Sequence, residues 1–410
     1  MRTQPSHRPT LPTFPSLGYV DRVELTLFVD HACNLRCSYC YNGKKFSRIM
    51  PGEVMRRSVD LALANRPALL DVSFFGGEPL LQPGFIEETL AYVEATVRTK
   101  GEPRSRLRYV MNTNGTLADD RVLALLAPPR NFTVYVSLDG PAAVHDAHRV
   151  DENGQGSFAG IVANLERMRQ AGIAFRLVAV VRPDTARRLG DIVRTLLDLR
   201  PAHITLGPDF RAPWTEESIA DLRAGLHDAG EVWSEGFRRG PVVPIEPLHG
   251  KILTHLKQGI PCPERCTLAG HAFAVAPTGR LYPCAQMIGE DSDADLVIGT
   301  VDSGFDQGRL AQLQRAKDRV EETCAPCALR DRCQSHCGCR HVALTGELGI
   351  INQALCEIEE SFILAADQVA SPLVAERCPA FLDTYYRKQY HPAAGATLTR
   401  LRRPSDPERA

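Results

Sequence analysis

The chain has 410 residues, of which 44% are hydrophobic and 24% are charged, and its formal net charge is −1. This composition is typical of a globular protein with room for one large and one smaller domain. The near-zero charge gives no bulk electrostatic attraction for a nucleic acid or an anionic membrane, so neither is expected as a partner.

The N-terminal segment, residues 1–19, is rich in proline and polar residues, and we expect it to be flexible. It lacks the apolar core of a signal peptide, and no stretch of the chain approaches the roughly 18 uninterrupted apolar residues of a membrane-spanning helix. We therefore expect a cytoplasmic protein. Because the cytosol keeps thiols reduced, the 13 cysteines are expected to be metal ligands rather than disulfides.

Residues 20–206 alternate short β-rich runs with helical patterns. Strands are predicted at Val23–Val29, Leu70–Phe75, Arg106–Asn112, Phe132–Leu138, Phe175–Val181 and His203–Leu206. Helices are predicted near 51–65, 84–99, 118–127, 157–171 and 184–199, with a further helix near 214–237. Such repeats favour a parallel sheet with right-handed crossovers. Because six repeats fall short of the eight in a full barrel, we predict an α/β fold with a partial (βα)6 TIM-like barrel over residues 20–240.

Three closely spaced cysteines follow the first predicted strand. Cys33, Cys37 and Cys40 have the spacing CxxxCxxC. A cubane iron–sulfur cluster normally takes four thiolates, so three thiolates without a fourth nearby would leave one iron open to another ligand. A zinc knuckle is the alternative, although zinc sites usually combine two pairs of ligands. The triad lies at the carboxyl end of a strand, where the active sites of barrels form.

The composition changes near Cys262, because ten of the 13 cysteines fall between residues 262 and 378. This region is rich in glycine, proline and cysteine, and its sequence contains few long helical patterns. We expect a linker and a small domain over residues 241–360 that is organised by metal rather than by a large apolar core. Residues 361–410 are expected to form a helical segment followed by a disordered tail.

The first cysteine motif resembles that of the radical S-adenosylmethionine (SAM) superfamily, CxxxCxΦC, with Tyr39 as the aromatic residue. The resemblance implies a [4Fe–4S] cluster on Cys33, Cys37 and Cys40, whose fourth iron chelates the amino and carboxylate groups of SAM. One electron from such a cluster cleaves SAM to methionine and a 5′-deoxyadenosyl radical. Chemistry is therefore expected to begin at this triad.

Motifs at the ends of later strands are similar to those of the same family. Gly76-Gly77-Glu78 would bind the SAM ammonium through backbone carbonyls and the acid, and the run from Ser137 to Arg149 is similar to the family pattern SLDGPxxxHDxxR. The residues implied in SAM binding are Tyr39, Gly76, Gly77, Glu78, Asn114, Ser137 and Arg149. Turn formation by glycine and Asx residues is the alternative explanation for these motifs.

The later cysteines resemble the seven-cysteine SPASM domain of radical SAM peptide maturases, which binds two auxiliary [4Fe–4S] clusters; the resemblance covers roughly residues 20–360. Its pattern implies a first auxiliary cluster on Cys262, Cys266, Cys284 and Cys337. It implies a second on Cys324, Cys327, Cys333 and Cys356. The sequence does not prove which cysteine serves which cluster, and a pair of structural zinc sites is the alternative. Cys339 and Cys378 remain, either as idle thiols or as a catalytic thiol; Cys339, in Cys337-Gly338-Cys339, could also compete as a cluster ligand.

The resemblance implies a radical SAM oxidoreductase that acts on a peptide or protein. We expect a maturase of a ribosomally made peptide that forms a thioether, a carbon–carbon crosslink or an oxidised side chain. A small-molecule substrate and anaerobic sulfatase maturation are alternatives within the family. In the sulfatase-maturing enzymes an aspartate base follows the second SPASM cysteine, whereas Ala285 follows Cys284 here and cannot accept a proton. A non-enzymatic iron–sulfur electron carrier is the alternative from another class.

The sequence does not assign the catalytic base or the hydrogen donor. Asp209, His271 and Glu290 are candidates by residue type. About 20 residues precede the first predicted strand, too few for a leader-binding winged-helix domain, so a separate leader-peptide-binding protein is expected as a partner. A flavodoxin or ferredoxin is expected as the electron donor.

Overall fold

The computed structural model describes residues 22–387 except 65, 101–105, 241, 258, 260–265, 267 and 269. The expected flexible segment at residues 1–19, the tail beyond residue 387 and Cys262 lie outside the described residues. Within the described part of the chain, no helix is both long and apolar enough to cross a membrane.

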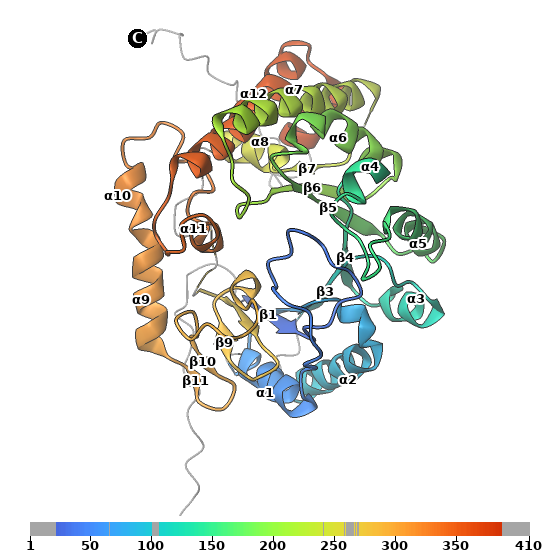
Figure 1. The fold of residues 1–410 in the computed structure, drawn as a ribbon, viewed down its shortest axis with the longest axis vertical. Helices are drawn as coiled ribbons and strands as arrows, with labels where there is room; N and C mark the ends of the chain where they lie inside the picture. The colour runs from blue at the N-terminus through green and yellow to red at the C-terminus, as the bar shows by residue number, and fades with distance from the viewer. Residues whose placement is uncertain are drawn as a thin grey trace, which may run out of the picture.

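A nine-stranded sheet in the order β7-β6-β5-β4-β3-β2-β1-β8-β9 forms the core. The six strands predicted from sequence are β1 (Arg22–Phe28), β2 (Leu69–Phe75), β3 (Arg106–Thr113), β4 (Phe132–Ser137), β5 (Phe175–Val181) and β6 (His203–Pro208). Each pairs in parallel with the next. The predicted partial barrel is confirmed, because the strands curve round a common interior with their helices outside (Figure 1).

The helices that connect these strands bury their apolar faces against the sheet, as the central core cluster of strand and helix residues shows. They are α1 (Gly52–Ala62), α2 (Pro83–Lys100), α3 (Asp120–Leu126), α4 (Ala142–His145), α5 (Phe158–Gln170), α6 (Leu189–Asp198) and α7 (Glu216–Arg239), with short turns η1 (Pro79–Leu81) and η2 (Ala186–Arg188). Side-chain caps start several of them; the Asp119 carboxylate accepts the Val122 N–H at the start of α3.

Strands from beyond residue 240 extend both edges of the sheet. Strand β7 (Ile245–Glu246) pairs with β6, while β8 (Ala272–Val275) pairs in parallel with β1 and β9 (Leu281–Tyr282) returns antiparallel to β8. The sequence analysis did not find these short strands. Their pairing places the cysteine-rich region directly beside the first strand and its loop, so the division expected at residue 240 cuts through one continuous sheet.

The cysteine-rich region holds mostly short elements, and one long helix enters the segment expected to be helical. Its elements are α8 (Leu248–Leu256), η4 (Ala285–Met287), β10 (Gly299–Thr300), β11 (Gly304–Phe305), α9 (Gln307–Asp318), α10 (Val320–Cys324), α11 (Gly338–Thr345), α12 (Gln353–Ala375), α13 (Pro379–Leu382) and η5 (Asp383–Arg387). Helix α12 has 23 residues and lies along α7 (Figure 1). It buries Ile358, Phe362 and Val369, an apolar stripe of helical period, and it crosses the boundary expected at residue 360.

Candidate functional site

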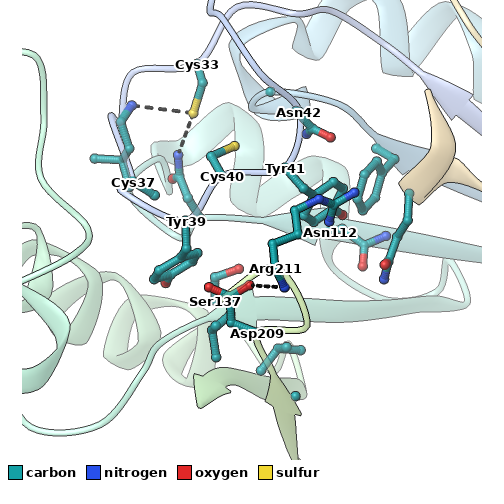
Figure 2. A pocket seen from close by; sticks show the side chains of 18 of the residues that line it. Cys33, Cys37, Tyr39, Cys40, Tyr41, Asn42, Asn112, Ser137, Asp209 and Arg211 are labelled. Atoms are coloured by element: carbon teal, nitrogen blue, oxygen red, sulfur yellow. Dashed lines mark hydrogen bonds between the residues drawn. The ribbon is translucent and has the colours of Figure 1, made fainter. Parts of the chain in front are cut away.

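A cavity of about 370 Å³ opens at the carboxyl ends of the parallel strands. Figure 2 shows the loop of the three cysteines on one side of it and Ser137 and Asp209 on the other. Most of the residues predicted for SAM binding are brought together here: Cys33, Cys37, Tyr39, Cys40, Gly76, Gly77, Asn114, Ser137 and Arg149 all line the cavity. These side chains were expected at the carboxyl ends of the strands, where barrel sites form, and they lie there.

Two glycines after β2 hold the cysteine loop in place. The Gly77 N–H donates to the Asp30 carbonyl at 2.8 Å, and the next N–H, of Glu78, donates to the Ala32 carbonyl at 2.9 Å. A Cβ on Gly77 would lie 2.0 Å from that Ala32 oxygen, and Gly76 has a φ of +140°, so neither position has room for a side chain. The glycines thus bring the end of β2 against the backbone that leads into Cys33.

Glu78 does not line the cavity; its fully buried carboxylate joins two strand ends instead. One oxygen accepts the Asn114 N–H at 2.7 Å, and the other accepts the Thr113 hydroxyl at 2.8 Å and the Leu80 N–H at 3.0 Å. Burial raises the pKa of Glu78 to about 7, although these donors favour its ionised form. The contact expected between this acid and the SAM ammonium stays a prediction, since one oxygen already accepts two hydrogen bonds and the other accepts one.

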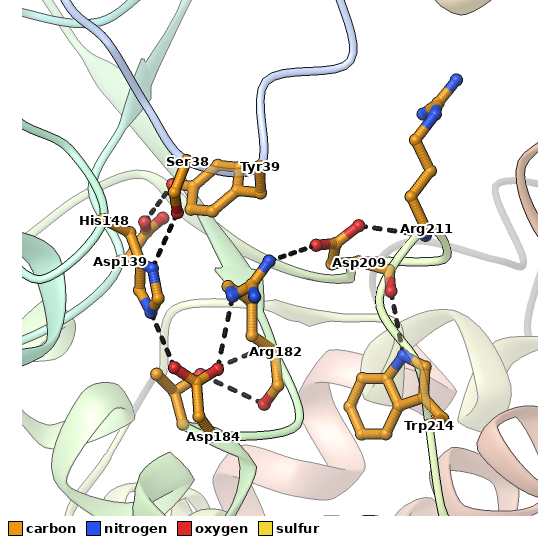
Figure 3. A network of polar contacts seen from close by, with 10 residues as sticks. Ser38, Tyr39, Asp139, His148, Arg182, Asp184, Asp209, Arg211 and Trp214 are labelled. Atoms are coloured by element: carbon orange, nitrogen blue, oxygen red, sulfur yellow. Dashed lines mark hydrogen bonds and ion pairs between the residues drawn. The ribbon is translucent and has the colours of Figure 1, made fainter.

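Tyr39 and Arg149 meet at a buried carboxylate, Asp139; Figure 3 shows Tyr39 beside it. The Tyr39 hydroxyl donates to Asp139, and the Arg149 guanidinium donates to the same side chain at 2.9 Å and 3.2 Å while lying 5.2 Å from the Tyr39 ring centre. Burial tends to raise the pKa of Asp139, but Arg149 and the hydrogen bonds hold it below its usual value. The arrangement fixes the aromatic residue of the cysteine motif against β4.

A second polar chain ties the cysteine loop to β5. The Ser38 hydroxyl lies 2.9 Å from His148 Nδ1, and His148 Nε2 lies 3.0 Å from the Asp184 carboxylate (Figure 3). The Ser38 N–H also donates to the His148 carbonyl at 3.0 Å. Because Ser38 stands between two of the three cysteines, this chain positions the loop rather than lining the cavity.

The three thiols of the motif lie beside an ammonium group and a backbone N–H donor. Burial raises the pKa of the Cys33 thiol to about 11 and also raises that of Cys37, so without a metal these groups stay protonated. The Lys45 ammonium lies 2.8 Å from Cys40 Sγ, and the Leu35 N–H donates to Cys33 Sγ at 3.4 Å. A soft, all-sulfur donor set of this kind fits an iron–sulfur cluster.

No three His, Cys, Asp or Glu side chains among the described residues are spaced as ligands round a single metal ion. A cubane distributes its thiolates over separate irons, and the cavity lies directly in front of the three thiols. The residues present therefore fit a cluster that Cys33, Cys37 and Cys40 would hold beside the cavity.

Several cavity residues escaped the sequence analysis. Tyr41 follows the motif and stacks with Phe75, and Arg211 lies 5.2 Å from the Tyr41 ring centre (Figure 2). The rule that strand ends carry function would have found Arg211, because it follows β6. Gln286, Cys339 and Arg340 enter the cavity from the cysteine-rich region, and no local pattern indicated that approach.

The three candidate acids and bases have different surroundings. Asp209 lines the cavity, and its carboxylate accepts the Arg182 guanidinium at 2.6 Å (Figure 3). Glu290 accepts the Lys44 N–H at 3.0 Å beside the cysteine loop but does not line the cavity. His271 lies 3.5 Å from Glu24 near the start of β8, away from the strand ends that surround the cavity. Only Asp209 of the three can meet a molecule in the cavity.

The later cysteines fall into two spatial groups. Cys266 contacts Cys337, Cys337 Sγ lies 3.0 Å from Cys339 Sγ, and Cys339 contacts Cys284. In the second group, burial and the neighbouring thiols of Cys333, Cys324 and Cys327 together raise the pKa of Cys356 to about 11. Cys378 lies apart from both groups, buried, with its thiol donating to the Phe237 carbonyl at 3.3 Å.

Comparison with known families gives one domain match. Residues 29–196 match the model of the radical SAM superfamily. The matched segment begins at the end of β1 and includes the cysteine loop, the two glycines, Asn114, Ser137 and Arg149.

Two curated enzymes are similar over most of the chain. The cysteine-type anaerobic sulfatase-maturating enzyme of Clostridium perfringens (strain 13 / Type A) is 25% identical over 333 residues, which cover 74% of this chain and 85% of that enzyme. The serine-type anaerobic sulfatase-maturating enzyme of Klebsiella aerogenes is 26% identical over 330 residues, which cover 75% of this chain and 77% of that enzyme.

The fold is also similar to a solved structure, native anSMEcpe with bound AdoMet and Cp18Cys peptide. The TM-score is 0.71 at 21% sequence identity, and the match covers 87% of this chain and 99% of the other. At this identity the likeness concerns the fold, and it extends through the cysteine-rich region.

Proposed function

Because residues 29–196 match the model of the radical SAM superfamily, we propose that this chain is a radical SAM enzyme that abstracts hydrogen from a peptide or protein substrate. The observation that carries the proposal is the convergence of Cys33, Cys37 and Cys40 on one cavity at the carboxyl ends of the strands. The family's cofactors are a [4Fe–4S] cluster and SAM, which together supply a 5′-deoxyadenosyl radical when bound.

Different residues of the chain hold the cluster and SAM. The three thiols ligate the cluster, while Gly76, Gly77, Asn114 and Ser137 present backbone and polar groups to SAM from neighbouring strand ends. Tyr39, Glu78 and Arg149 act by positioning, because their polar atoms bond mainly to the protein itself. Arg149 also lines the cavity, so its guanidinium can meet the SAM carboxylate on its free side.

We assign two auxiliary clusters to the later cysteines, in a domain proposed for residues 241–360. The proximity of Cys324, Cys327, Cys333 and Cys356 supports one complete set of four ligands. Cys266, Cys284 and Cys337 belong to the other, whose fourth ligand is Cys262 by the family pattern. With both clusters fully ligated, their proposed role is to accept electrons from the substrate and pass them onward, and a flavodoxin or ferredoxin is the proposed electron donor to the first cluster.

The substrate class follows from the relatives. Two sulfatase-maturating enzymes match about three quarters of the chain, so oxidation of a cysteine or serine side chain to formylglycine is the first candidate reaction. A peptide in the related structure supports a peptide substrate. Asp209 is the cavity carboxylate available as the base, since Ala285 cannot serve, and its ion pair with Arg182 would have to open for proton transfer.

One observation favours a second candidate, maturation of a ribosomally made peptide by crosslinking. Ala285 stands directly after Cys284, so the position that supplies a base for aldehyde formation carries a methyl group. Radical coupling that forms a thioether or a carbon–carbon bond does not form an aldehyde, so it does not require that base directly after Cys284. In this case a separate leader-peptide-binding protein is the proposed partner.

The two candidates differ in product chemistry. The test is anaerobic incubation of the reconstituted protein with SAM, dithionite and a sulfatase-derived peptide that contains cysteine or serine at the modified position, followed by mass measurement and labelling with a hydrazide. Formylglycine formation removes two hydrogens, exchanges sulfur for oxygen in the cysteine peptide, and creates an aldehyde that reacts with the hydrazide. SAM cleavage without any aldehyde on either peptide would exclude sulfatase maturation and favour the crosslinking candidate.

A further inference from the structure

We propose that Arg211 binds a carboxylate of the peptide substrate, which is either an acidic side chain close to the modified residue or the C-terminal carboxylate. The proposal rests on the proposed function, since it names a chemical feature of that enzyme's substrate. The groups that carry it are Arg211 and its neighbours on the same wall of the cavity, Tyr41 and Asn42.

The wall of the cavity carries more positive than negative charge. Its cationic side chains are Lys45, Arg149, Arg211 and Arg340, and Asp209 is the only carboxylate among the described residues that line it. The Asp209 carboxylate is already paired, because the Arg182 guanidinium donates to it at 2.6 Å. An anionic group on a bound molecule would therefore be attracted to this cavity.

Three of these cations have partners within the protein. Arg149 and Arg340 each form an ion pair with a buried carboxylate. The Lys45 ammonium lies beside a thiol of the first cysteine motif, where it would face a cluster. Within the part of the chain that the structure describes, the Arg211 guanidinium has an aromatic ring as its neighbour and no carboxylate at ion-pair distance. Arg211 is thus the cavity cation that lacks a counter-charge.

The backbone that carries Arg211 is held in a turn after β6. The Arg211 N–H donates to the Asp209 carboxylate at 3.0 Å, and the Trp214 indole N–H donates to the Asp209 carbonyl at 2.9 Å. The Arg211 side chain extends away from Asp209 (Figure 3), so it does not pair with that carboxylate. The turn therefore presents the guanidinium to the cavity.

The guanidinium lies over an aromatic face. Its central carbon is 5.2 Å from the Tyr41 ring centre, and the Tyr41 ring stacks in turn with Phe75 at 6.3 Å (Figure 2). An arginine held in this way keeps its N–H donors available for a planar, bidentate contact with a carboxylate. Because Arg211 is exposed, a molecule in the cavity can reach those donors.

Asn42, which directly follows Tyr41, offers a second unused group on this wall. Its side chain is only 6% exposed, and its Nδ2 donates to the Gly76 carbonyl at 2.6 Å. Its Oδ1 has no hydrogen-bond partner among the described residues, although a buried acceptor without a donor is unfavourable. A peptide with a carboxylate supplies both missing partners, a backbone N–H for Asn42 and an anion for Arg211.

The test is affinity selection from a random peptide library with one fixed cysteine, prepared once with a free C-terminal carboxylate and once with a C-terminal amide. The reconstituted full-length protein with bound SAM and no reductant is the bait, as wild type, Arg211→Gln and Arg211→Glu. Arg194→Gln is the matched control, because it removes the same charge from an exposed position on α6 that does not line the cavity. Dissociation constants are then measured for SAM, for an enriched acidic peptide and for its neutral counterpart.

The wild type should enrich peptides with Asp or Glu near the fixed cysteine, or free C-termini over amides, and these two outcomes distinguish the sources of the carboxylate. Arg211→Gln should bind the acidic peptide about tenfold more weakly, as expected for loss of a charged hydrogen-bonded pair, and should bind the neutral peptide as the wild type does. Arg211→Glu should favour basic peptides instead. Arg194→Gln should match the wild type throughout.

The proposal is overturned if the wild type shows no preference for a carboxylate, or if Arg211→Glu keeps the same preference. It is also overturned if Arg211→Gln loses affinity for SAM, because the guanidinium would then bind the cofactor. If the wild type retains no peptide from either library, the proposed peptide substrate fails instead.

Discussion

The Glu78 carboxylate accepts the backbone N–H of Asn114 at 2.7 Å, with both residues buried at the ends of neighbouring strands. The next glycine upstream, Gly77, is bonded to the loop that leads into Cys33. The segment Gly76-Gly77-Glu78 is thus a junction between the cysteine loop, β2 and β3. Its acid belongs to the frame of the site, while its glycines form part of the cavity wall.

Replacing Glu78 by glutamine should change how stability depends on pH. The pKa of Glu78 is about 7 in the fold against 4.5 for the free side chain, so the folded state keeps a proton that the unfolded state releases between these values. Stability is therefore expected to fall by an amount on the order of 3 kcal/mol as pH rises from about 4.5 to about 7, and to level off above that.

The measurement is urea unfolding of the iron-free wild type and of Glu78→Gln across this pH range. The variant cannot ionise, so its curve should lack this decline. It should also be less stable than the wild type at low pH, because an amide NH₂ cannot accept the Asn114 N–H. Parallel pH curves for the two proteins would contradict the assignment.

Gly77→Ala should disable the site while leaving the barrel folded. The new methyl group would lie 2.0 Å from the Ala32 carbonyl oxygen, so the cysteine loop must move. We expect the variant to bind about four irons fewer than the wild type, with unchanged circular dichroism. Gly160→Ala is the matched control, because nothing lies within 4 Å of that position on α5. If both variants bind the same amount of iron, the close packing of Gly77 against Ala32 has no role in cluster binding.

Asp139→Asn should destabilise the fold strongly. The substitution leaves Arg149 buried without its counter-charge and weakens the acceptor for Tyr39. A loss of about 3–5 kcal/mol in the free energy of unfolding is expected for a broken buried pair. The control is Asp191→Asn on α6, whose partner Arg194 is exposed, and which should change little. Denaturant unfolding of the iron-free proteins gives both values, and a similar small loss in each would refute the role of Asp139.

Lys45 should tune the first cluster through its charge. Its ammonium lies 2.8 Å from Cys40 Sγ, and a nearby cation favours the reduced, more negative form of a cluster. Lys45→Met should therefore shift the reduction potential of this cluster to a more negative value, while Lys45→Arg should shift it less. Potentiometric titration followed by electron paramagnetic resonance measures the shift. A potential that does not move in Lys45→Met would exclude an electrostatic role.

The barrel could be predicted from the sequence because its strands show an apolar pattern and several have a motif directly after them. Buried parallel strands are mostly apolar runs, such as Leu177–Val181 in β5, and the functional motifs stand immediately after such strands. All six strand predictions lie within two residues of the observed bounds. Nine of the residues predicted for the site line one cavity for the same reason.

The sequence could not predict contacts between distant segments. Strand β8 has four residues, and its place beside β1 is decided by tertiary pairing. The approach of Cys339 and Arg211 to Tyr41 depends on that pairing and on the course of the loop after β6. Helix α12 was expected from residue 361, whereas it begins at Gln353, where the Asn352 side chain caps it.

The most direct test of the central claim is SAM cleavage. The reconstituted wild type, incubated anaerobically with SAM and dithionite, should release 5′-deoxyadenosine, and replacement of Cys33, Cys37 and Cys40 by alanine should abolish this release while the protein keeps the iron of its auxiliary clusters. Formation of 5′-deoxyadenosine by the triple variant, or none by a wild type that carries its full complement of iron, would contradict the account.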